Sequence, residues 1–346
     1  MKELNEKLEK LENITKPKIG IVGTTSWGTA LSIIIARNHE NVTLFSRSIA
    51  EANQLNEKRI NPKLGENIKI SENIMISKIN EKINKLDLIM IAVPSQSFRK
   101  NILQIKNYLN PKTLIVSATK GLERNTCKRM SEILEEELDP SMSKKICVLS
   151  GPNLALEVVT QKHSSTVLAS KNISTAIQVQ QILNSKEFRA YTNSDIIGVE
   201  LGGALKNIIA LGAGICDGLK VGDNAKAAFI TRGLKEITRL AISAGANPET
   251  LSGLSGLGDL IATCSSTLSR NHFVGEKLAQ GIDIQTIKQS MIHVAEGIET
   301  TLVAVKLAKK FDVELPITTG INSIIKKELS LTEAISKLLD RSPFHE

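Results

Sequence analysis

Lys206 is the residue whose sequence surroundings most clearly indicate chemistry. It lies within GVELGGALKNIIALGAG, where nearly all of its neighbours are apolar or small. Burial strips water from an ammonium group and lowers its pKa toward the range that acid/base catalysis requires. A structural role is the alternative, in which Lys206 pairs with Glu200 or another carboxylate at a domain interface. The segment therefore predicts either a general acid/base or a buried ion pair.

Three further polar groups could bind an anionic substrate. Lys120 follows an apolar run in SATKGLE, and Gly121 after it allows close backbone approach. Ser269-Arg270-Asn271 is a compact triplet whose arginine suits a phosphate. Asp259, in the glycine-rich GLSGLGDLIAT, could hydrogen-bond a substrate hydroxyl. Each has a structural alternative: a solvent-facing lysine, a helix start capped by Ser269, or a helix cap at Asp259.

Residues 18–31, KIGIVGTTSWGTAL, have the pattern of a dinucleotide site. An apolar run suits a buried strand, and residues 29–37 suit a helix with one apolar side. Between them, Gly23 and Gly28 hold the first and sixth places of the Gly-x-Gly-x-x-Gly fingerprint. This arrangement turns backbone N–H groups and a helix dipole toward a diphosphate. Thr25 holds the third place, so an ordinary strand-to-helix turn is the alternative.

The composition favours a protein with real cores and a small-molecule partner. A length of 346 residues allows two domains, and 41% hydrophobic with 23% charged residues is typical of a soluble protein. The net charge of +8 is spread along the chain, and aromatics make up only 3%, so we expect no nucleic-acid partner. The apolar stretch 196–219 is interrupted by Glu200, Lys206 and Asp217, so we expect no membrane insertion.

Cysteine and histidine spacing gives no indication of a metal or redox centre. Four cysteines and five histidines lie far apart, without ligand spacing, so we expect no metal. Reduced thiols and an N-terminus without an apolar signal core predict a cytoplasmic protein. The sequence contains no Gly-x-Ser-x-Gly elbow, the motif that would indicate a hydrolase.

Residues 17–194 alternate short apolar runs with helical patterns, which predicts a Rossmann-like, doubly wound parallel sheet. The strands are expected at 19–22, 41–46, 86–93, 113–118, 146–149, 166–169 and 188–191, with one or two more within 68–76. Ligands bind at the carboxyl ends of such strands. One crevice should therefore be lined by Gly23, Arg47, Pro94, Lys120 and Gly151.

The pattern changes at about residue 195, after which no convincing strand occurs. We expect an all-helical substrate domain over 195–346, joined to the sheet by a long apolar helix at 195–218. Residues 1–16 carry Leu4, Leu8 and Leu11 at helical spacing, and we interpret them as an N-terminal extension.

Several phrases together resemble the bacterial-type NAD(P)-dependent glycerol-3-phosphate dehydrogenase family. They are GTTSWGTAL, AVPS, SATKGLE, SGPNLALEV, VELGGALKNIIALGAG, GLSGLGDLIATC, SRN and AEGIETT, in the family's order. The resemblance covers nearly all of the chain from Lys18 to the last helix. It implies a Rossmann domain plus a helical domain that interconvert glycerone phosphate and sn-glycerol 3-phosphate for glycerophospholipid synthesis. The expected partner is thus a phosphorylated triose, and a homodimer is left open.

The resemblance also implies site residues. Lys206 resembles the family's catalytic acid/base. The implied cofactor set, with the glycines of the turn, is Gly23, Ser26, Trp27, Gly28, Arg47, Lys120, Ala155, Arg270, Val294 and Glu296. The implied substrate set is Lys120, Gly151, Asn153, Lys206, Asp259, Ser269, Arg270 and Asn271. Thr25 departs from the family's usual glycine, and Asn153 departs from a small hydroxyl residue.

Arg47 bears on the choice of cofactor. It follows the expected second strand, 19 residues after Gly28 (47 − 28), where NAD-specific proteins place an acidic residue that binds the ribose. No Asp or Glu occurs between residues 41 and 50. A guanidinium can instead bind a 2′-phosphate. We therefore predict that NADPH is preferred and NADH accepted; stacking on adenine or exposure to solvent is the alternative.

Two other functions fit parts of the pattern. A related β-hydroxy acid or ketopantoate-type dehydrogenase would also use a lysine on the joining helix. The Ser269–Asn271 triplet and Lys120-Gly121 favour a phosphate substrate instead. A catalytically silent NADP-binding sensor is the other alternative, and Lys206 beside Asn207 argues against it.

Overall fold

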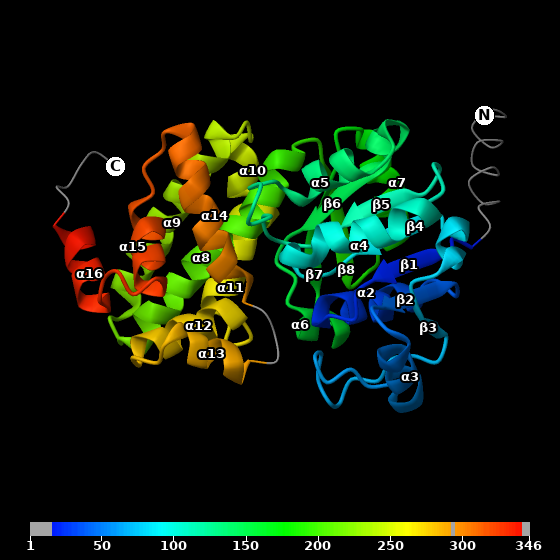
Figure 1. The fold of residues 1–346 in the computed structure, drawn as a ribbon, viewed down its shortest axis with the longest axis horizontal. Helices are drawn as coiled ribbons and strands as arrows, with labels where there is room; N and C mark the ends of the chain where they lie inside the picture. Colours follow the sequence, from blue (N-terminus) through cyan, green and yellow to red (C-terminus); the bar gives the residue numbers. More distant parts are fainter. Residues whose placement is uncertain (1–15, 292–294, 341–346) are drawn as a thin grey trace.

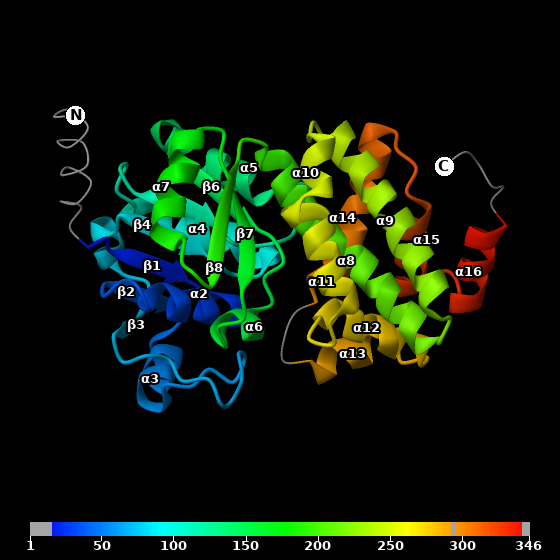
Figure 2. The same cartoon turned by 180° about the vertical axis from the view of Figure 1, so that it is seen from behind.

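The computed structural model of the chain describes residues 16–291 and 295–340. The extension expected at residues 1–15 and the predicted cofactor residue Val294 lie outside these ranges. Two bodies lie next to each other, one built around a sheet and one built of helices (Figures 1 and 2). The α/β prediction with a helical second half is thereby confirmed.

The sheet has eight strands in the order β3-β2-β1-β4-β5-β6-β7-β8. Their bounds are β1 (Ile19–Val22), β2 (Val42–Ser46), β3 (Ile74–Lys78), β4 (Leu88–Ile91), β5 (Leu114–Ser117), β6 (Ile146–Ser150), β7 (Ser164–Ala169) and β8 (Phe188–Asn193). The order reverses between β1 and β4, the switch point at which doubly wound sheets bind ligands.

One strand pair departs from the predicted parallel arrangement. β7 runs antiparallel to β6, and every other neighbouring pair in the sheet is parallel. Between β6 and β7 the chain forms only the short helix α6 (Ala155–Val159), which does not cross the sheet. The chain therefore re-enters the sheet at the edge it has just left.

Helices cover both faces of the sheet. Because side chains alternate along a strand, Leu88 and Met90 of β4 enter one core, whereas Ile89 and Ile91 enter the other. The first core is closed by α2 (Ser26–Ala36), α3 (Ile49–Lys58), α6 and α7 (Ile173–Leu183). The second is closed by α4 (Phe98–Ile105), α5 (Met130–Glu137) and the start of α8. Short 3₁₀ helices lie at Glu81–Lys85, Ser95–Ser97, Lys106–Tyr108 and Pro140–Lys145.

Two helices begin elsewhere than the pattern predicts. Helix α2 begins at Ser26 rather than residue 29, because the Thr25 side chain accepts a hydrogen bond from the Gly28 N–H and caps the helix. Helix α5 begins at Met130 rather than about residue 126, because Cys127 has a left-handed backbone (φ 59°) in a tight turn.

The helical half surrounds α8 (Ile196–Gly218), as Figures 1 and 2 show. The other helices are α9 (Asp223–Ser243), α10 (Pro248–Ser252), a π-helical turn (Leu254–Gly258), α11 (Asp259–Ser265), α12 (Arg270–Ala279), α13 (Ile284–Ser290), α14 (Glu296–Phe311), α15 (Pro316–Ile325) and α16 (Leu331–Leu339). Within the described ranges, α8 is the one helix whose length and apolar composition would suit a membrane span, and 89% of that stretch is buried inside the protein.

Glycines let α8 approach both halves closely. A Cβ at Gly203 would lie 2.2 Å from the Ser150 hydroxyl, at the end of β6. A Cβ at Gly214 would lie 2.0 Å from the carbonyl oxygen of His272 on α12. Because real Cβ atoms cannot approach so closely, these small residues fix α8 between the sheet edge and the helices that carry the site.

Candidate active site

Lys206 is buried and shares a carboxylate with a second lysine. Its ammonium group forms an ion pair with Asp259 and donates to the Thr263 hydroxyl at 2.6 Å. The Lys120 ammonium lies 2.6 Å from the other Asp259 oxygen and donates to the Gly151 carbonyl at 2.8 Å. The structure thus brings together Lys206, Lys120, Asp259 and Gly151. The two that are farthest apart in the sequence, Lys120 and Asp259, are separated by 139 residues.

Three elements position this cluster. Lys206 lies in the middle of α8, Lys120 follows β5, and Asp259 is the first residue of α11. Thr263 follows Asp259 by four residues, so one turn of α11 places both side chains on the same side. The alternative partner Glu200 instead accepts from Arg129 at 2.7 Å. Lys206 is therefore an ion-paired lysine at the crevice. Its ammonium group can still exchange a proton.

The pKa of Lys206 lies well below that of an ordinary lysine. Burial is the main cause, and the nearby Lys120 charge adds to it. The Asp259 carboxylate opposes both, and the resulting pKa is about 7. Near neutral pH, Lys206 can therefore both donate and accept a proton.

The triplet Ser269–Asn271 forms the start of α12. Ser269 caps the helix, because its hydroxyl accepts from the His272 N–H at 3.3 Å. Asn271 is buried; its amide donates to the Asn207 side chain at 2.8 Å and accepts from the Gly297 N–H at 2.9 Å. Arg270 is exposed and has no hydrogen bond or ion pair within the described part of the chain. Of the three, Arg270 is the one whose side chain is available to an anion.

The glycine turn has the geometry that a dinucleotide requires. Gly23 has φ +113°, and a Cβ there would lie 2.6 Å from the Ala92 carbonyl oxygen. A Cβ at Gly28 would lie 1.9 Å from the Gly23 carbonyl oxygen. Thr25, the departure from the fingerprint, donates to the Ala92 carbonyl at 2.7 Å and accepts from Gly28. It thereby fastens the turn to the end of β4.

The start of α2 fits a diphosphate. With the Gly28 N–H taken by Thr25, the N–H groups of Ser26 and Trp27 have no acceptor among the described residues. Unsatisfied N–H groups in a first helical turn bind phosphates readily. The Ser26 hydroxyl donates to the Lys63 carbonyl at 2.5 Å, and the Trp27 ring packs against Phe188 with centroids 6.4 Å apart. The side chains of Ser26 and Trp27 therefore hold the turn in place, while their N–H groups remain without an acceptor in the described part of the chain.

Arg47 lies just past β2 with its side chain 84% exposed. Its partner Glu51 is one helical turn away at 3.5 Å, and the Lys63 ammonium lies 3.0 Å from the same carboxylate. Glu51 also accepts from the Thr24 hydroxyl of the glycine turn at 2.7 Å. Two cations and one carboxylate thus lie beside the turn.

Glu296 joins the two halves. It is the first residue of α14, and its carboxylate accepts from the Ser95 N–H at 3.0 Å and from the Ser95 hydroxyl. Burial raises the pKa of Glu296, while Ser95 and the Arg270 charge oppose the shift. Since Ser95 follows β4, this contact crosses from the helical half to the carboxyl edge of the sheet.

Two predicted residues lie after β6 or in α6. Asn153 donates to the Ser165 carbonyl at 2.9 Å, and its amide oxygen is buried without a partner among the described residues. That buried oxygen lacks a hydrogen-bond donor in the described part of the structure. Ala155 is the partly buried first residue of α6 and packs against the core of the sheet half.

The structure brings in four residues to which the sequence assigns no site role: Ser95, Lys63, Asn207 and Thr263. The spacing of four residues between Asp259 and Thr263 was a readable signal, because both flank a helical turn. Ser95 begins a short 3₁₀ helix and Lys63 lies in a loop, and the partners of both lie in other elements, so no local pattern marks them.

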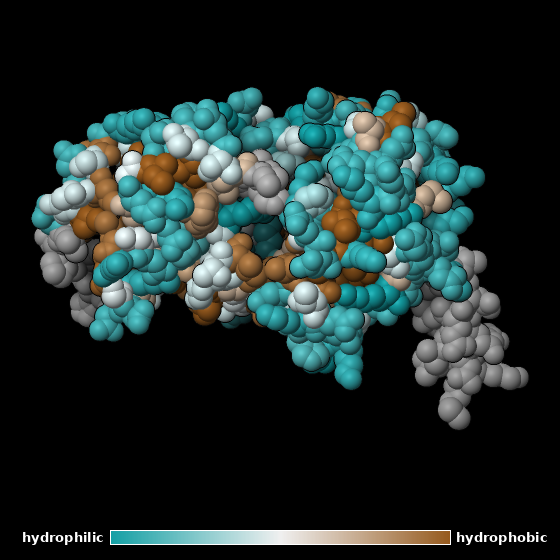
Figure 3. Space-filling model, turned by 90° about the horizontal axis from the view of Figure 1, so that it is seen from below, coloured by the Kyte–Doolittle hydropathy of each residue, from teal (hydrophilic) through white to brown (hydrophobic). Residues whose placement is uncertain are grey.

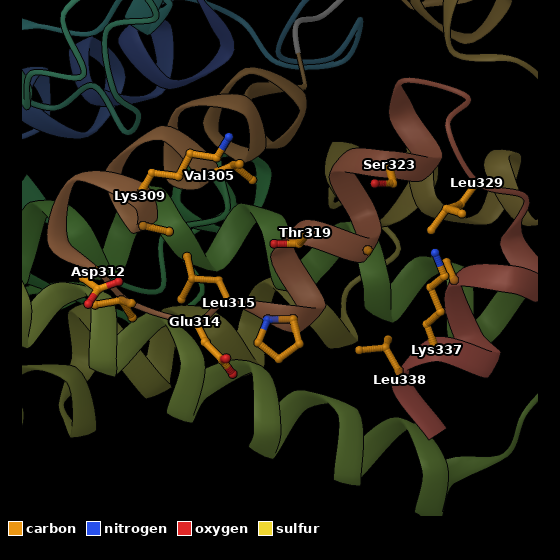
Figure 4. Close-up of a pocket in the computed structure, with 15 residues that line it drawn as sticks. Val305, Lys309, Asp312, Glu314, Leu315, Thr319, Ser323, Leu329, Lys337 and Leu338 are labelled. Carbon is orange, nitrogen blue, oxygen red and sulfur yellow. The ribbon is translucent and has the colours of Figure 1, made fainter. Parts of the chain in front are cut away.

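The space-filling view shows a hollow between the two halves (Figure 3). A separate hollow of about 540 Å³ lies among α14, α15 and α16 (Figure 4), and none of the predicted site residues lines it. In residues 16–291 and 295–340, no group of three or more His, Cys, Asp or Glu side chains could hold a metal ion.

A glycine turn at the switch point of a doubly wound sheet, facing a buried lysine of a helical half, defines a two-domain nucleotide-dependent oxidoreductase. Residues 18–176 match the N-terminal part, and residues 195–336 the C-terminal part, of the family described as NAD-dependent glycerol-3-phosphate dehydrogenase. The chain belongs to this family, and the resemblance seen in its sequence is confirmed.

Similar proteins match about 95% of this chain. A glycerol-3-phosphate dehydrogenase [NAD(P)+] of Dehalococcoides mccartyi (strain ATCC BAA-2100) is 48% identical over 95% of this chain and 92% of its own. One from Halalkalibacterium halodurans is 42% identical over 95% of each chain. The crystal structure of glycerol-3-phosphate dehydrogenase from Coxiella burnetii is similar with a TM-score of 0.88 and 36% identity, over 94% of this chain and 99% of that one.

Proposed function

We propose that the chain is an NAD(P)-dependent dehydrogenase that reduces glycerone phosphate to sn-glycerol 3-phosphate, in the cytoplasm, for glycerophospholipid synthesis. The sheet half, residues 17–194, binds the cofactor, and the helical half, residues 195–346, binds most of the substrate. The observation that carries the proposal is the buried Lys206, with a pKa of about 7, paired with Asp259 together with Lys120 from the carboxyl edge of the sheet.

Lys206 acts as the acid/base. A bound nicotinamide would supply the hydride for reduction or accept it for oxidation. In reduction, the Lys206 ammonium hydrogen-bonds the C2 oxygen and gives it a proton; in oxidation, the neutral amine takes the proton back. Asp259 and Thr263 hold the ammonium in position. Lys120 adds a second positive charge where negative charge develops on oxygen.

Arg270 binds the substrate phosphate. A guanidinium pairs with phosphate through two parallel hydrogen bonds, and Arg270 has no hydrogen bond or ion pair of its own among the described residues, although the Glu296 charge acts on it. Ser269 and Asn271 fix the helix start that carries it. Gly151 and Asn153 form the opposite wall, where the orphaned amide oxygen of Asn153 can accept from a substrate hydroxyl.

NADPH is the preferred cofactor, and NADH is accepted. The exposed Arg47, with Lys63 beside it, supports this preference, because their charges can bind a 2′-phosphate. Gly23, Gly28 and the free N–H groups of α2 bind the diphosphate. Ala155 and Glu296 contribute to the cofactor side of the crevice.

The test is loss of reduced-nicotinamide absorbance on adding glycerone phosphate, run with NADPH and then with NADH. We expect turnover with both and higher efficiency with NADPH. Ketopantoate, and 3-hydroxyisobutyrate in the oxidative direction, serve as competing substrates. Faster turnover of either would assign the chain to the alternative class of dehydrogenase, and cofactor binding without turnover would favour the sensor.

A further inference from the structure

The start of α12 is held from behind by a buried histidine. His272 is 4% exposed, and its Nε2 lies 2.6 Å from a carboxylate oxygen of Asp217 on α8. The Lys226 ammonium of α9 donates to the same oxygen at 2.5 Å. Burial raises the pKa of Asp217, but the hydrogen bonds from Lys226 and His272 outweigh it and leave this pKa below its usual value. Asp217 is therefore a charged acceptor for the histidine.

The helix geometry relates His272 to Arg270. Two residues along an α-helix correspond to a rotation of about 200°, so the two side chains leave α12 on nearly opposite sides. Arg270 is exposed, while His272 points into the packing against α8 and α9. Asn271, between them, bonds to Asn207 and Gly297.

Close packing of α12 against α8 limits how the start of α12 can move. A Cβ at Gly275 would lie 2.0 Å from the Leu211 carbonyl oxygen, and one at Gly214 would lie 2.0 Å from that of His272. The backbones of α8 and α12 are thus in contact and cannot approach further. The remaining freedom is rotation or fraying of the first turn, which the bonds of Asn271 and His272 oppose.

We propose that the His272–Asp217 hydrogen bond is a positioning device that aims Arg270 at the substrate phosphate, an inference that rests on the proposed function. His272 touches neither substrate nor cofactor in this arrangement. It acts through the first turn of α12, and its loss lets Arg270 sample directions that do not meet the phosphate. The cost falls on substrate affinity rather than on the proton transfer at Lys206.

The test compares His272→Leu, His272→Gln and Asp217→Ala with the wild type. The glutamine keeps an N–H donor and the leucine keeps bulk without one. We expect the leucine and alanine variants to raise KM for glycerone phosphate about 3- to 10-fold, the scale of one hydrogen bond. The same factor should appear in the dissociation constant of inorganic phosphate, measured by calorimetry. KM for NADPH should be unchanged, and His272→Gln should recover most of the loss.

His39→Leu is the matched control, because His39 is a partly buried histidine whose Nε2 bonds a carbonyl, that of Ile182, at 2.8 Å in the sheet half. It should lower the thermal midpoint and leave KM for glycerone phosphate unchanged. Lower stability of His272→Leu with unchanged KM and phosphate affinity would overturn the inference. If His272→Leu does not fold, unchanged phosphate affinity in Asp217→Ala overturns it equally. Absence of turnover in the wild type would contradict the proposed function, while the phosphate titration would still decide the inference.

Discussion

At the scale of single residues, the proposed acid/base role of Lys206 makes activity depend on pH. Its ammonium is lost as pH rises through about 7. We therefore expect kcat/KM for reduction to fall about tenfold per pH unit above that value, because reduction needs the protonated lysine. Oxidation needs the neutral amine, so its kcat/KM should rise over the same range. Initial rates in both directions from pH 6 to 9 check this, and profiles that move together would contradict it.

Replacement of Lys206 by methionine removes the proton donor and keeps most of the volume. We expect Lys206→Met to bind cofactor normally and to lose at least about 10²-fold in kcat, the usual contribution of general acid/base catalysis. Cofactor titration with single-turnover kinetics separates the two effects. Near-normal turnover in a folded variant would place the acid/base elsewhere.

Arg270→Ala should weaken binding of glycerone phosphate by about 1.5–3 kcal/mol, because a charge-assisted hydrogen bond to the phosphate is lost. Steady-state KM and phosphate inhibition measure the change. Arg239→Ala is a suitable comparison, since that arginine of α9 donates to the Glu314 carbonyl at 3.1 Å. Equal effects of the two substitutions would rule out a specific role for Arg270.

Arg47→Ser should separate the two cofactors. Loss of one contact to a 2′-phosphate, about 1.5–3 kcal/mol, corresponds to a drop of roughly 10- to 150-fold in efficiency with NADPH. Efficiency with NADH should change much less, so NADH is the internal control. Matching losses with both cofactors would show that Arg47 serves the adenosine or the fold.

Residues that belong to a local sequence motif could be predicted from the sequence, whereas contacts made across the crevice could not. The lysine in an apolar helix, the glycine turn and the arginine triplet could be predicted, because each carries its signal within a few positions. The partner of Lys206 could not: Asp259 lies 53 residues away, and Glu200, one helical turn and a half before it, was the nearer candidate. Sequence distance does not tell which carboxylate the fold brings close.

At the scale of elements, helix starts and strand direction were hard to predict for a related reason. The α2 start depends on one hydrogen bond, from the Gly28 N–H to Thr25, which a pattern of apolar residues does not encode. The direction of β7 depends on whether the connecting segment crosses the sheet, and α6 is too short to do so. Periodicity reports which face is buried, not where the chain turns.

Helix α15 offers a test of buried electrostatics at this scale. Glu236 of α9 is 2% exposed and accepts from the N–H groups of Ile317 and Thr318, at 2.8 and 3.0 Å. Burial raises its pKa to about 7, although these bonds oppose the shift. The folded state therefore holds a proton that the unfolded chain releases above about pH 4.5. The contribution of Glu236 to the free energy of unfolding is therefore greatest below about pH 4.5 and is lost as pH rises through about 7.

We expect the wild type to lose about 3 kcal/mol more free energy of unfolding between pH 4.5 and 7 than Glu236→Gln, which cannot titrate. Urea denaturation of both proteins across this range gives the difference, in which the other titrating groups cancel. Parallel stability curves would mean that the helix N–H groups keep Glu236 charged throughout.

At the scale of the whole molecule, the proposed site draws its residues from both halves, so we expect their junction to matter for catalysis. The Lys120–Asp259 ion pair connects the sheet edge to α11, and the hydrogen bonds from Ser95 to Glu296 connect it to α14. The start of α8 also enters the core under the sheet through Ile196 and Val199. Helix α8 is therefore part of both halves, and it carries Lys206.

Glu200 fastens α8 to the sheet half, one turn and a half before Lys206. Its buried carboxylate accepts from Arg129 at 2.7 Å and from the Ser131 N–H at 2.8 Å, both at the start of α5. Glu200→Gln leaves Arg129 only the more exposed Glu132, at 3.4 Å, as a charge partner, and removal of one member of a buried pair costs about 3–5 kcal/mol. We expect that loss in the free energy of unfolding, together with a lower kcat, because α8 becomes free to shift against the sheet edge.

Glu157→Gln is the matched control, because Glu157 pairs with Lys162 at 3.4 Å on an exposed surface, where such pairs contribute about 0–1 kcal/mol. Denaturant titration and kcat for both variants give the comparison. If Glu200→Gln were as stable and active as Glu157→Gln, the halves would be held by the crevice contacts alone. The position of the Lys206 ammonium would then depend on its pairing with Asp259 and not on the Glu200 contact that holds α8.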